Sequence, residues 1–309
     1  MDNAVRTKYV RWQWRTLIAL MLGYICYYFL RKNFSAAIPA MKAELGLSKV
    51  QLGIFLTLNG IVYGVSRMIN GLPPVEEFES GTTDTEGQLT GEKYKKFISA
   101  MVFRNPMIWG ISIADFCVYV IRFTILEWGT SFLTQYKGFD ITLAASIVAA
   151  SELIGGVLGT IAAGWVTDHL FRSRTLRTSA IFTLGATICF TLFWRVPSGA
   201  PWIWSAIPIV ASSFFIYGPQ ALLGVSCSQY ATKRASGSAN GFCGIFCYGA
   251  TAISGIGFGW LADRPGMGWN AVFVVAIVFG LLGTLILSSF WRAPADGYEK
   301  AEEILKQCR

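Results

Sequence analysis

Eight apolar runs, each roughly 20 residues long, recur along this chain of 309 residues. A run of that length is long enough to cross the hydrocarbon core of a bilayer. Backbone polar groups inside lipid must be satisfied within the segment, so each run is expected to be a helix. The sequence therefore predicts an all-α integral membrane protein with about eight transmembrane helices. The runs cover about residues 14–38, 50–71, 107–134, 143–166, 178–195, 202–227, 236–262 and 270–291.

One long polar stretch, residues 73–104, separates the first two runs from the other six. It begins with Pro73-Pro74, carries several acids, and is typical of a linker that becomes an amphipathic helix near residues 93–103. The predicted organisation is thus a helix pair in 1–72, a cytoplasmic linker in 73–104, a six-helix bundle in 105–292 and a cytoplasmic tail in 293–309.

The basic residues indicate how the chain is oriented. With a cytoplasmic N-terminus, 17 of the 26 Lys and Arg residues fall in cytoplasmic segments, five fall outside and four lie within spans. This asymmetry follows the positive-inside rule and predicts that both termini are cytoplasmic. The net charge of +8 then reflects topology, and no basic, aromatic-rich soluble segment indicates a nucleic-acid partner.

Two arginines near the middle of apolar runs are the leading candidates for a binding site. Arg31 follows Tyr28 by three residues in one run, and Arg122 follows Tyr119 by three in another. A charge at the centre of a membrane helix costs roughly 2.5–3.5 kcal/mol on insertion scales, and a guanidinium matches phosphate or carboxylate oxygens bidentately. The pattern predicts an anion site, with snorkelling or structural pairing as the alternative. Arg67 ends the second run. It is expected either to contact the anion or to be an interfacial cation.

Each tyrosine lies one helical turn before its arginine and on the same face. Its expected role is to orient the guanidinium, to donate a hydrogen bond to the ligand, or only to pack against its neighbours. Asp115 and Glu152 are intramembrane acids, for which proton carriage, pairing with arginine and a structural hydrogen-bonded role are the alternatives.

Catalytic chemistry and bound metals are not expected. The only histidine is His169, so a histidine-based triad or metal cluster is unavailable. Cys243 and Cys247 share a helix face, but the pattern favours small buried residues at a helix contact over a disulfide or a metal site. We expect no enzyme activity, no metal and no cofactor.

Two further motifs predict turns or moving parts. Gly164, Asp168, Arg172 and Arg174 fall in a cytoplasmic connection between two spans, where the aspartate can cap a helix and pair with an arginine. Gly218-Pro219 interrupts the run at 202–227, and proline removes a backbone hydrogen bond, so a break or kink is expected there.

These motifs together resemble the organophosphate:inorganic phosphate antiporter family of the major facilitator superfamily, which includes transporters of glycerol 3-phosphate and hexose 6-phosphate and a hexose-phosphate sensor. The resemblance lies in residues 23–34, 63–67, 118–128, 164–174 and 217–220. It implies that Arg31 and Arg122 bind the substrate phosphate, that Arg67 is the basic residue closing the second helix, and that Tyr119 is the tyrosine before the second arginine. It also implies a bacterial inner membrane.

The chain departs from that family after Leu72. Family members have twelve helices, whereas here Pro73-Pro74 follows the second helix directly, as if helices three to six were absent. We therefore expect an incomplete major facilitator fold, surrounded by membrane lipid, whose exchange of an organophosphate for inorganic phosphate is weak or lost and which forms a homodimer if the missing wall is replaced. The alternative is a membrane sensor of hexose phosphate that acts on a histidine kinase.

Overall fold

The structure is a computed structural model that describes residues 33–69 and 92–308 and, before them, residues 11–12, 14–16, 18–19 and 22–23. All the regular elements in this part of the chain are helices. Four of the elements are π-helical turns, named η2 to η5. In chain order they are α2 (Asn33–Leu45), α3 (Lys49–Ile69), α4 (Glu92–Ile98), η2 (Ser99–Phe103), α5 (Pro106–Phe123), η3 (Thr124–Trp128), α6 (Gly129–Gln135), α7 (Ile141–Ala150), η4 (Ser151–Gly155), α8 (Gly156–His169), α9 (Thr175–Arg195), α10 (Trp202–Ala252), η5 (Ile253–Gly257), α11 (Phe258–Asp263), α12 (Gly268–Ser289) and α13 (Tyr298–Cys308).

Within the described residues, six helices are long and apolar enough to cross a membrane, and they match the six runs predicted after the linker. They span Pro106–Gln135, Ile141–His169, Thr175–Arg195, Trp202–Thr232, Ala235–Asp263 and Gly268–Ser289. The second predicted run, 50–71, is helical as α3, whereas most of the first lies outside the described residues. The helix expected near 93–103 is present as α4 and η2.

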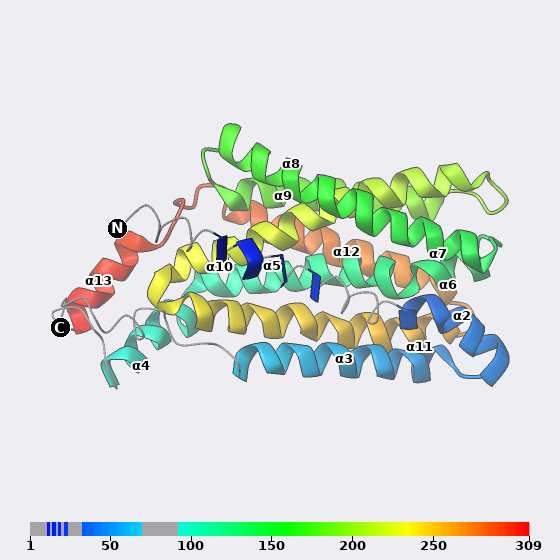
Figure 1. Ribbon diagram of the computed structural model, residues 1–309, viewed down its shortest axis with the longest axis horizontal. Coiled ribbons are helices and arrows are strands. Elements are labelled where there is room, and N and C mark those ends of the chain that lie inside the picture. Colours follow the sequence, from blue (N-terminus) through cyan, green and yellow to red (C-terminus); the bar gives the residue numbers. More distant parts are fainter. Residues whose placement is uncertain are drawn as a thin grey trace.

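Helix α3 lies along the C-terminal half of α10 and along α11, so a segment from before the linker joins the bundle that follows it (Figure 1). The approach is close because Gly53 faces Gly255: a Cβ on Gly53 would stand 2.6 Å from the Gly255 carbonyl carbon. Small residues at such contacts allow helix backbones to meet in a membrane, where packing rather than hydrophobic burial drives association.

A polar contact also joins α3 to the end of α11. The Lys49 backbone amide at the start of α3 donates to Asp263 Oδ2 at 2.7 Å, and the Lys42 ammonium lies 3.4 Å from Asp263 Oδ1. The Lys49 ammonium donates to the Ala262 carbonyl at 3.0 Å. Asp263 therefore fills the capping position of a helix far away in sequence, since the first amides of a helix have no intrahelical partner.

The π-helical turns leave backbone groups that other helices satisfy. The Trp128 indole of η3 donates to the Ser254 carbonyl of η5 at 2.6 Å, and the Thr57 hydroxyl of α3 donates to the Thr251 carbonyl at 2.9 Å. The Ser254 hydroxyl in turn donates to the Glu127 carboxylate at 3.0 Å. Irregular helix at membrane depth is tolerated where protein supplies such partners, and single π turns occur often at functional sites.

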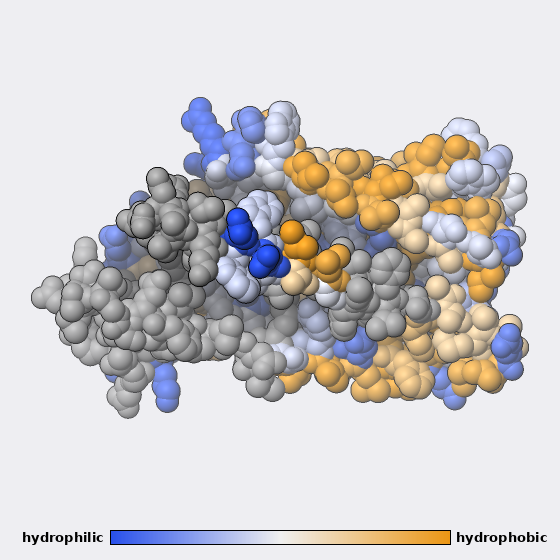
Figure 2. Space-filling view, in the orientation of Figure 1, coloured by the Kyte–Doolittle hydropathy of each residue, from blue (hydrophilic) through white to orange (hydrophobic). Residues whose placement is uncertain are grey.

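The ends of the bundle carry polar caps. On the face drawn in Figure 2, hydrophobic side chains cover much of the right-hand half, and hydrophilic ones lie at its right-hand edge. Asp140 caps α7 by accepting from the amides of Thr142 and Leu143, and these bonds lower the pKa of its carboxyl. Lys137 donates to the carbonyls of Trp194 and Val196, which close α9, and its burial lowers the pKa of its ammonium.

Helix α10 is not broken at Pro219, and the kink expected there stays a prediction. Helix α10 keeps helical backbone angles through this proline, and its one non-helical residue is Thr232, with φ 63° and ψ 171°. A proline costs a helix one internal hydrogen bond, and neighbouring groups in a packed bundle can compensate for that loss. The chain instead turns at Thr232, between the spans that end and begin there, where a β-branched residue is strained at positive φ.

Candidate functional site

Arg122 lies at the last turn of α5 and is only 8% exposed, deep in the bundle. Aromatic rings surround its guanidinium. The guanidinium carbon stands 5.2 Å from the centre of the Tyr217 ring, 5.4 Å from that of Tyr119 and 5.7 Å from that of Phe123. Contacts between a cation and aromatic faces stabilise a desolvated charge without neutralising it.

Arg122 forms no ion pair with a carboxylate among the residues that the structure describes. Its Nη2 donates to the Tyr217 hydroxyl across a long 3.5 Å, and its Nε has no hydrogen-bond partner there. The Tyr217 hydroxyl donates to the Glu152 carboxylate of η4 in a short hydrogen bond. The result is a buried cation with most of its five donors uncommitted and an acid held one tyrosine away.

Two cavities meet at Arg122. One, of about 300 Å³, is lined by Arg122 and Tyr248 together with Phe34, Ser35, Phe55, Leu56, Asn59, Phe123, Leu126 and Glu127. The other, of about 330 Å³, is lined by Arg122 and Tyr248 together with Tyr63, Asp115, Tyr119, Gln220, Gly224, Asn240, Cys243, Gly244 and Cys247. Asp115 and Tyr119, which precede Arg122 on α5, line the second cavity. Phe123, Leu126 and Glu127, which follow it, line the first, so the guanidinium lies between the cavities along this helix.

Sequence reasoning missed three aromatic or polar partners of this site: Tyr217, Tyr248 and Asn59. The Tyr248 ring lies 5.9 Å from that of Tyr119 and 4.5 Å from that of Tyr63 on α3, which connects the N-terminal helix to the site. Tyr217 belonged to a motif that drew attention only for its proline. Tyr248 follows Gly244 by one helical turn, a spacing compatible with one face but too common to mark a site.

The other predicted anion ligands are only partly placed. Tyr28 and Arg31 lie outside the described residues. Arg67 lies near the end of α3, one turn after Tyr63, but its side chain is also outside them. Of the five predicted substrate residues, the structure thus brings Arg122 and Tyr119 together.

The expected pairing of Asp168 with an arginine was wrong. Asp168 accepts from the Ser173 hydroxyl at 3.3 Å, and no ion pair joins it to a described arginine. The turn is made by Arg172 and Ser173, whose φ angles of 51° and 62° are left-handed, after which Arg174 occupies the N-cap position of α9. A Cβ on Gly164 would meet open space.

Gly218 has a clear packing role, because a Cβ there would lie 2.6 Å from the Phe182 ring and 2.8 Å from the Ala163 Cβ. It thus lets α10 approach α8 and α9.

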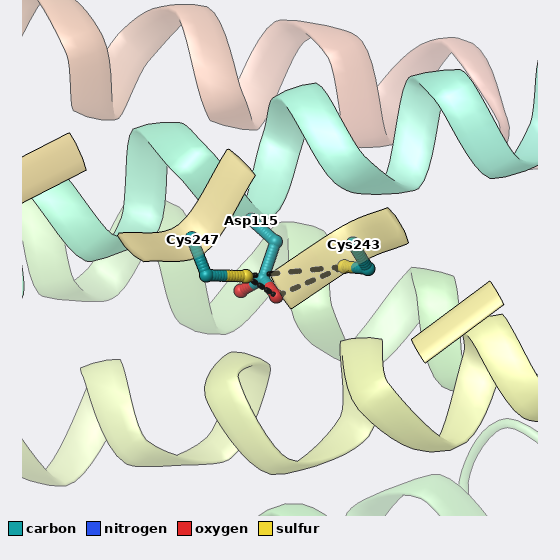
Figure 3. A group of neighbouring side chains, drawn as sticks. All are labelled: Asp115, Cys243 and Cys247. Atoms are coloured by element: carbon teal, nitrogen blue, oxygen red, sulfur yellow. Dashed lines mark hydrogen bonds between the residues drawn. The ribbon is translucent and has the colours of Figure 1, made fainter. Parts of the chain in front are cut away.

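A second buried group lies beside the Arg122 site. Asp115 Oδ2 accepts from the Cys247 thiol at 2.7 Å and from the Cys243 thiol at 3.4 Å, and the two sulfurs are 3.9 Å apart (Figure 3). The three groups come from α5 and α10 and are all buried. Asp115 and Glu152 thus both accept hydrogen bonds, and proton carriage by either acid stays a prediction.

In a comparison with known families, the model of the Major Facilitator Superfamily matches residues 73–255. This stretch covers more than half of the chain. It includes the linker and most of the six predicted spans that follow, as well as Arg122.

Individual relatives are narrower in function. The chain is 31% identical over 227 residues to a glycerol-3-phosphate transporter of Bacillus subtilis, covering 72% of this chain and 50% of the relative. It is also 31% identical over 225 residues to the membrane sensor protein UhpC of Escherichia coli, covering 72% and 50%. The chain thus spans about half the length of these relatives. Their names agree with the organophosphate:phosphate antiporter type of the superfamily.

A third relative is aligned almost from end to end. The chain is 21% identical over 434 positions to a probable hexose phosphate transport protein of Chlamydia trachomatis, covering 96% of this chain and 94% of the relative. Because 434 positions exceed the 309 residues of the chain by 125, the alignment must contain positions that this chain lacks. A deficit of this size is compatible with four helices of roughly 20 residues and their loops.

Proposed function

This chain belongs to the Major Facilitator Superfamily, and we propose that it binds inorganic phosphate and a phosphorylated small metabolite at Arg122. The observation that carries the proposal is a buried guanidinium with no carboxylate partner among the described residues. A buried charge is costly unless a counter-charge is supplied. A phosphate offers that charge and two oxygens at the spacing of the guanidinium fork.

The surroundings of Arg122 favour an anion that binds reversibly over a permanently bound counter-ion. Each adjoining cavity is large enough for a phosphate or a small organophosphate, and Tyr119, Tyr217 and Tyr248 offer hydroxyls and rings around the charge. Arg67 and, outside the described residues, Arg31 and Tyr28 complete the proposed ligand set.

The proposed activity is secondary transport, in which one anion is exchanged for the other. A charged residue between two cavities is suited to alternating access, where the site opens to one side at a time. In this chain, exchange is weak or absent, because helices three to six, which would supply the opposite wall, are missing. If a homodimer forms, it replaces part of that wall. The reaction needs no metal, cofactor or catalytic residue.

The proposed setting is the bacterial inner membrane. Both termini are placed in the cytoplasm because the predicted cytoplasmic segments carry 17 of the 26 Lys and Arg residues. The domains remain those predicted: the helix pair 1–72, the linker 73–104, the bundle 105–292 and the tail 293–309. Gly164, Asp168, Arg172 and Arg174 form the proposed cytoplasmic turn, and Gly218 and Pro219 the proposed flexible section of α10.

The test uses the purified full chain. Binding of labelled inorganic phosphate is measured in detergent, and exchange is measured in liposomes loaded with phosphate or glycerol 3-phosphate. We expect saturable binding that organophosphates displace and that sulfate displaces less well, with exchange slower than for a twelve-helix relative at equal protein density. Folded protein that binds no phosphate would refute the proposal.

Sensing is a second candidate, favoured by the 31% identity to a membrane sensor protein. A sensor and a transporter need the same phosphate site, so binding alone does not separate them. Hexose phosphate binding without exchange, together with co-purification of a histidine kinase, would select the sensor. Exchange above the rate of empty vesicles would select the transporter.

A further inference from the structure

We propose that Asp115, Cys243 and Cys247 form a binding site for one thiophilic divalent cation, Zn²⁺ being the physiological example. This site is separate from Arg122 and does not depend on the proposed transport activity. The sequence alone had favoured a helix contact, and no metal site, for Cys243 and Cys247.

The spacing of the three ligand atoms carries the proposal. They all lie within 4.8 Å of one another, and the two sulfurs are 3.9 Å apart. Two thiolates that bind one tetrahedral zinc at ~2.3 Å have their sulfurs about 3.8 Å apart. The Cys243 sulfur stands 3.4 Å from Asp115 Oδ2, close to the roughly 3.6 Å that a shared zinc requires. The Cys247 sulfur, at 2.7 Å from the same oxygen, must move away from it by about 0.9 Å to share a zinc with it.

The helix geometry explains this arrangement. Cys243 and Cys247 are four residues apart on α10, so their side chains lie one above the other on one face. Asp115 reaches them from α5, the helix packed against that face (Figure 3). A pair of ligands on one helix and a third on its neighbour fix an ion between two rigid elements.

The surroundings give the ion access and charge balance. All three residues line the cavity of about 330 Å³, so an ion reaches them without unfolding the bundle. Two thiolates and a carboxylate around Zn²⁺ leave one negative charge, and Arg122 lines the same cavity. Thiolates select soft ions such as Zn²⁺ or Cd²⁺ over Mg²⁺ and Ca²⁺.

The experiment measures metal binding by the reduced, purified full chain. We expect one Zn²⁺ per chain by calorimetry and metal analysis, no competition by millimolar Mg²⁺, and a thiolate-to-metal absorption band when Cd²⁺ is added. The double variant Cys243→Ser/Cys247→Ser should lose saturable binding and the band. Asp115→Asn removes a direct ligand and should weaken binding by at least the roughly 10- to 100-fold that loss of an outer-shell partner costs. The matched control Cys189→Ser alters a half-buried cysteine on α9 and should bind as the wild type does.

A second measurement tests the proposal in the wild type alone, so that it does not depend on whether the double variant folds. In the wild type, Zn²⁺ should protect Cys243 and Cys247 from alkylation, as followed by mass spectrometry, and should leave Cys189 unaffected. Folded wild type that binds no Zn²⁺, or that binds it without protecting these two thiols, would overturn the proposal. So would a folded double variant that retains the Cd²⁺ band.

Discussion

Replacing Arg122 by methionine should strongly weaken phosphate binding without loss of stability. The side chain is 8% exposed, its Nε is unbonded, and its only hydrogen bond spans 3.5 Å, so its internal contacts are mainly with aromatic rings. Two charge-assisted hydrogen bonds to a phosphate contribute about 1.5–3 kcal/mol each. The dissociation constant should therefore rise by roughly 10²- to 10⁴-fold, at about 1.4 kcal/mol for each factor of ten.

The stability readout separates a binding arginine from a structural one. A buried charge without a counter-ion is unfavourable, and an apolar side chain of similar length removes that cost. The unliganded Arg122→Met protein should thus unfold at the same temperature as the wild type or a higher one, while phosphate should raise the unfolding temperature of the wild type alone. Arg122→Lys keeps a point charge and should bind with intermediate affinity.

The assay is equilibrium binding of radiolabelled phosphate together with thermal unfolding in the same detergent. Arg177→Ala is the matched control, because Arg177 also stacks on an aromatic ring, that of Trp291, but lines neither cavity. Its phosphate affinity should match that of the wild type. Phosphate binding by Arg122→Met within threefold of the wild type, or clear destabilisation of that variant without ligand, would refute the reasoning.

Three smaller predictions concern single contacts. Tyr217→Phe removes a hydroxyl but keeps the ring that stacks on the guanidinium, so phosphate affinity should fall by less than about tenfold; a hundredfold loss would assign the hydroxyl to the ligand. Gly53→Ala places a Cβ 2.6 Å from the Gly255 carbonyl carbon and should lower the free energy of unfolding by about 1–3 kcal/mol. The control Gly164→Ala places a Cβ in open space and should not lower it. The carboxyl pKa of Asp140 is held below its usual value, so this group stabilises the fold above about pH 4 and ceases to do so as the pH falls through the lowered pKa. Thermal unfolding from pH 6 to 3 should therefore decline more steeply in the wild type than in Asp140→Asn, and equal slopes would contradict this.

Much of the fold followed from hydrophobic length alone. The six spans after the linker were placed to within a few residues, because a bilayer fixes both the minimum length and the composition of a crossing helix. Arg122 and Tyr119 were found for a related reason: a charge in such a run is costly enough to stand out, and a tyrosine one turn earlier must share its face.

The partners of Arg122 could not be found in this way. Tyr217 and Tyr248 come from α10, and which of its residues face α5 depends on how the helices rotate when they pack. The cysteine pair shows the same limit, since four-residue spacing placed Cys243 and Cys247 on one face but gave no sign that Asp115 lies opposite. A break was expected at Pro219 and is absent, because a packed bundle tolerates the missing amide of a proline. The turn at Thr232 was not expected, because no strong sequence signal marks it.

The π turn after Arg122 affects how the rest of its span is rotated relative to α5. A π turn holds one residue more than α-helix of the same axial length, and one residue corresponds to about 100° of rotation. The extra residue in Thr124–Trp128 is taken up by the wider turn, so α6 faces as it would after a regular helix one residue shorter, and the Phe132 ring lies 4.4 Å from that of Phe273. Deleting one residue here would return the segment to regular α-helix and leave Phe132 facing α12, whereas a deletion in the regular helix of α5 would turn Phe132 away by about 100°. This segment can therefore differ in length by one residue while the two halves of the span keep their relative rotation.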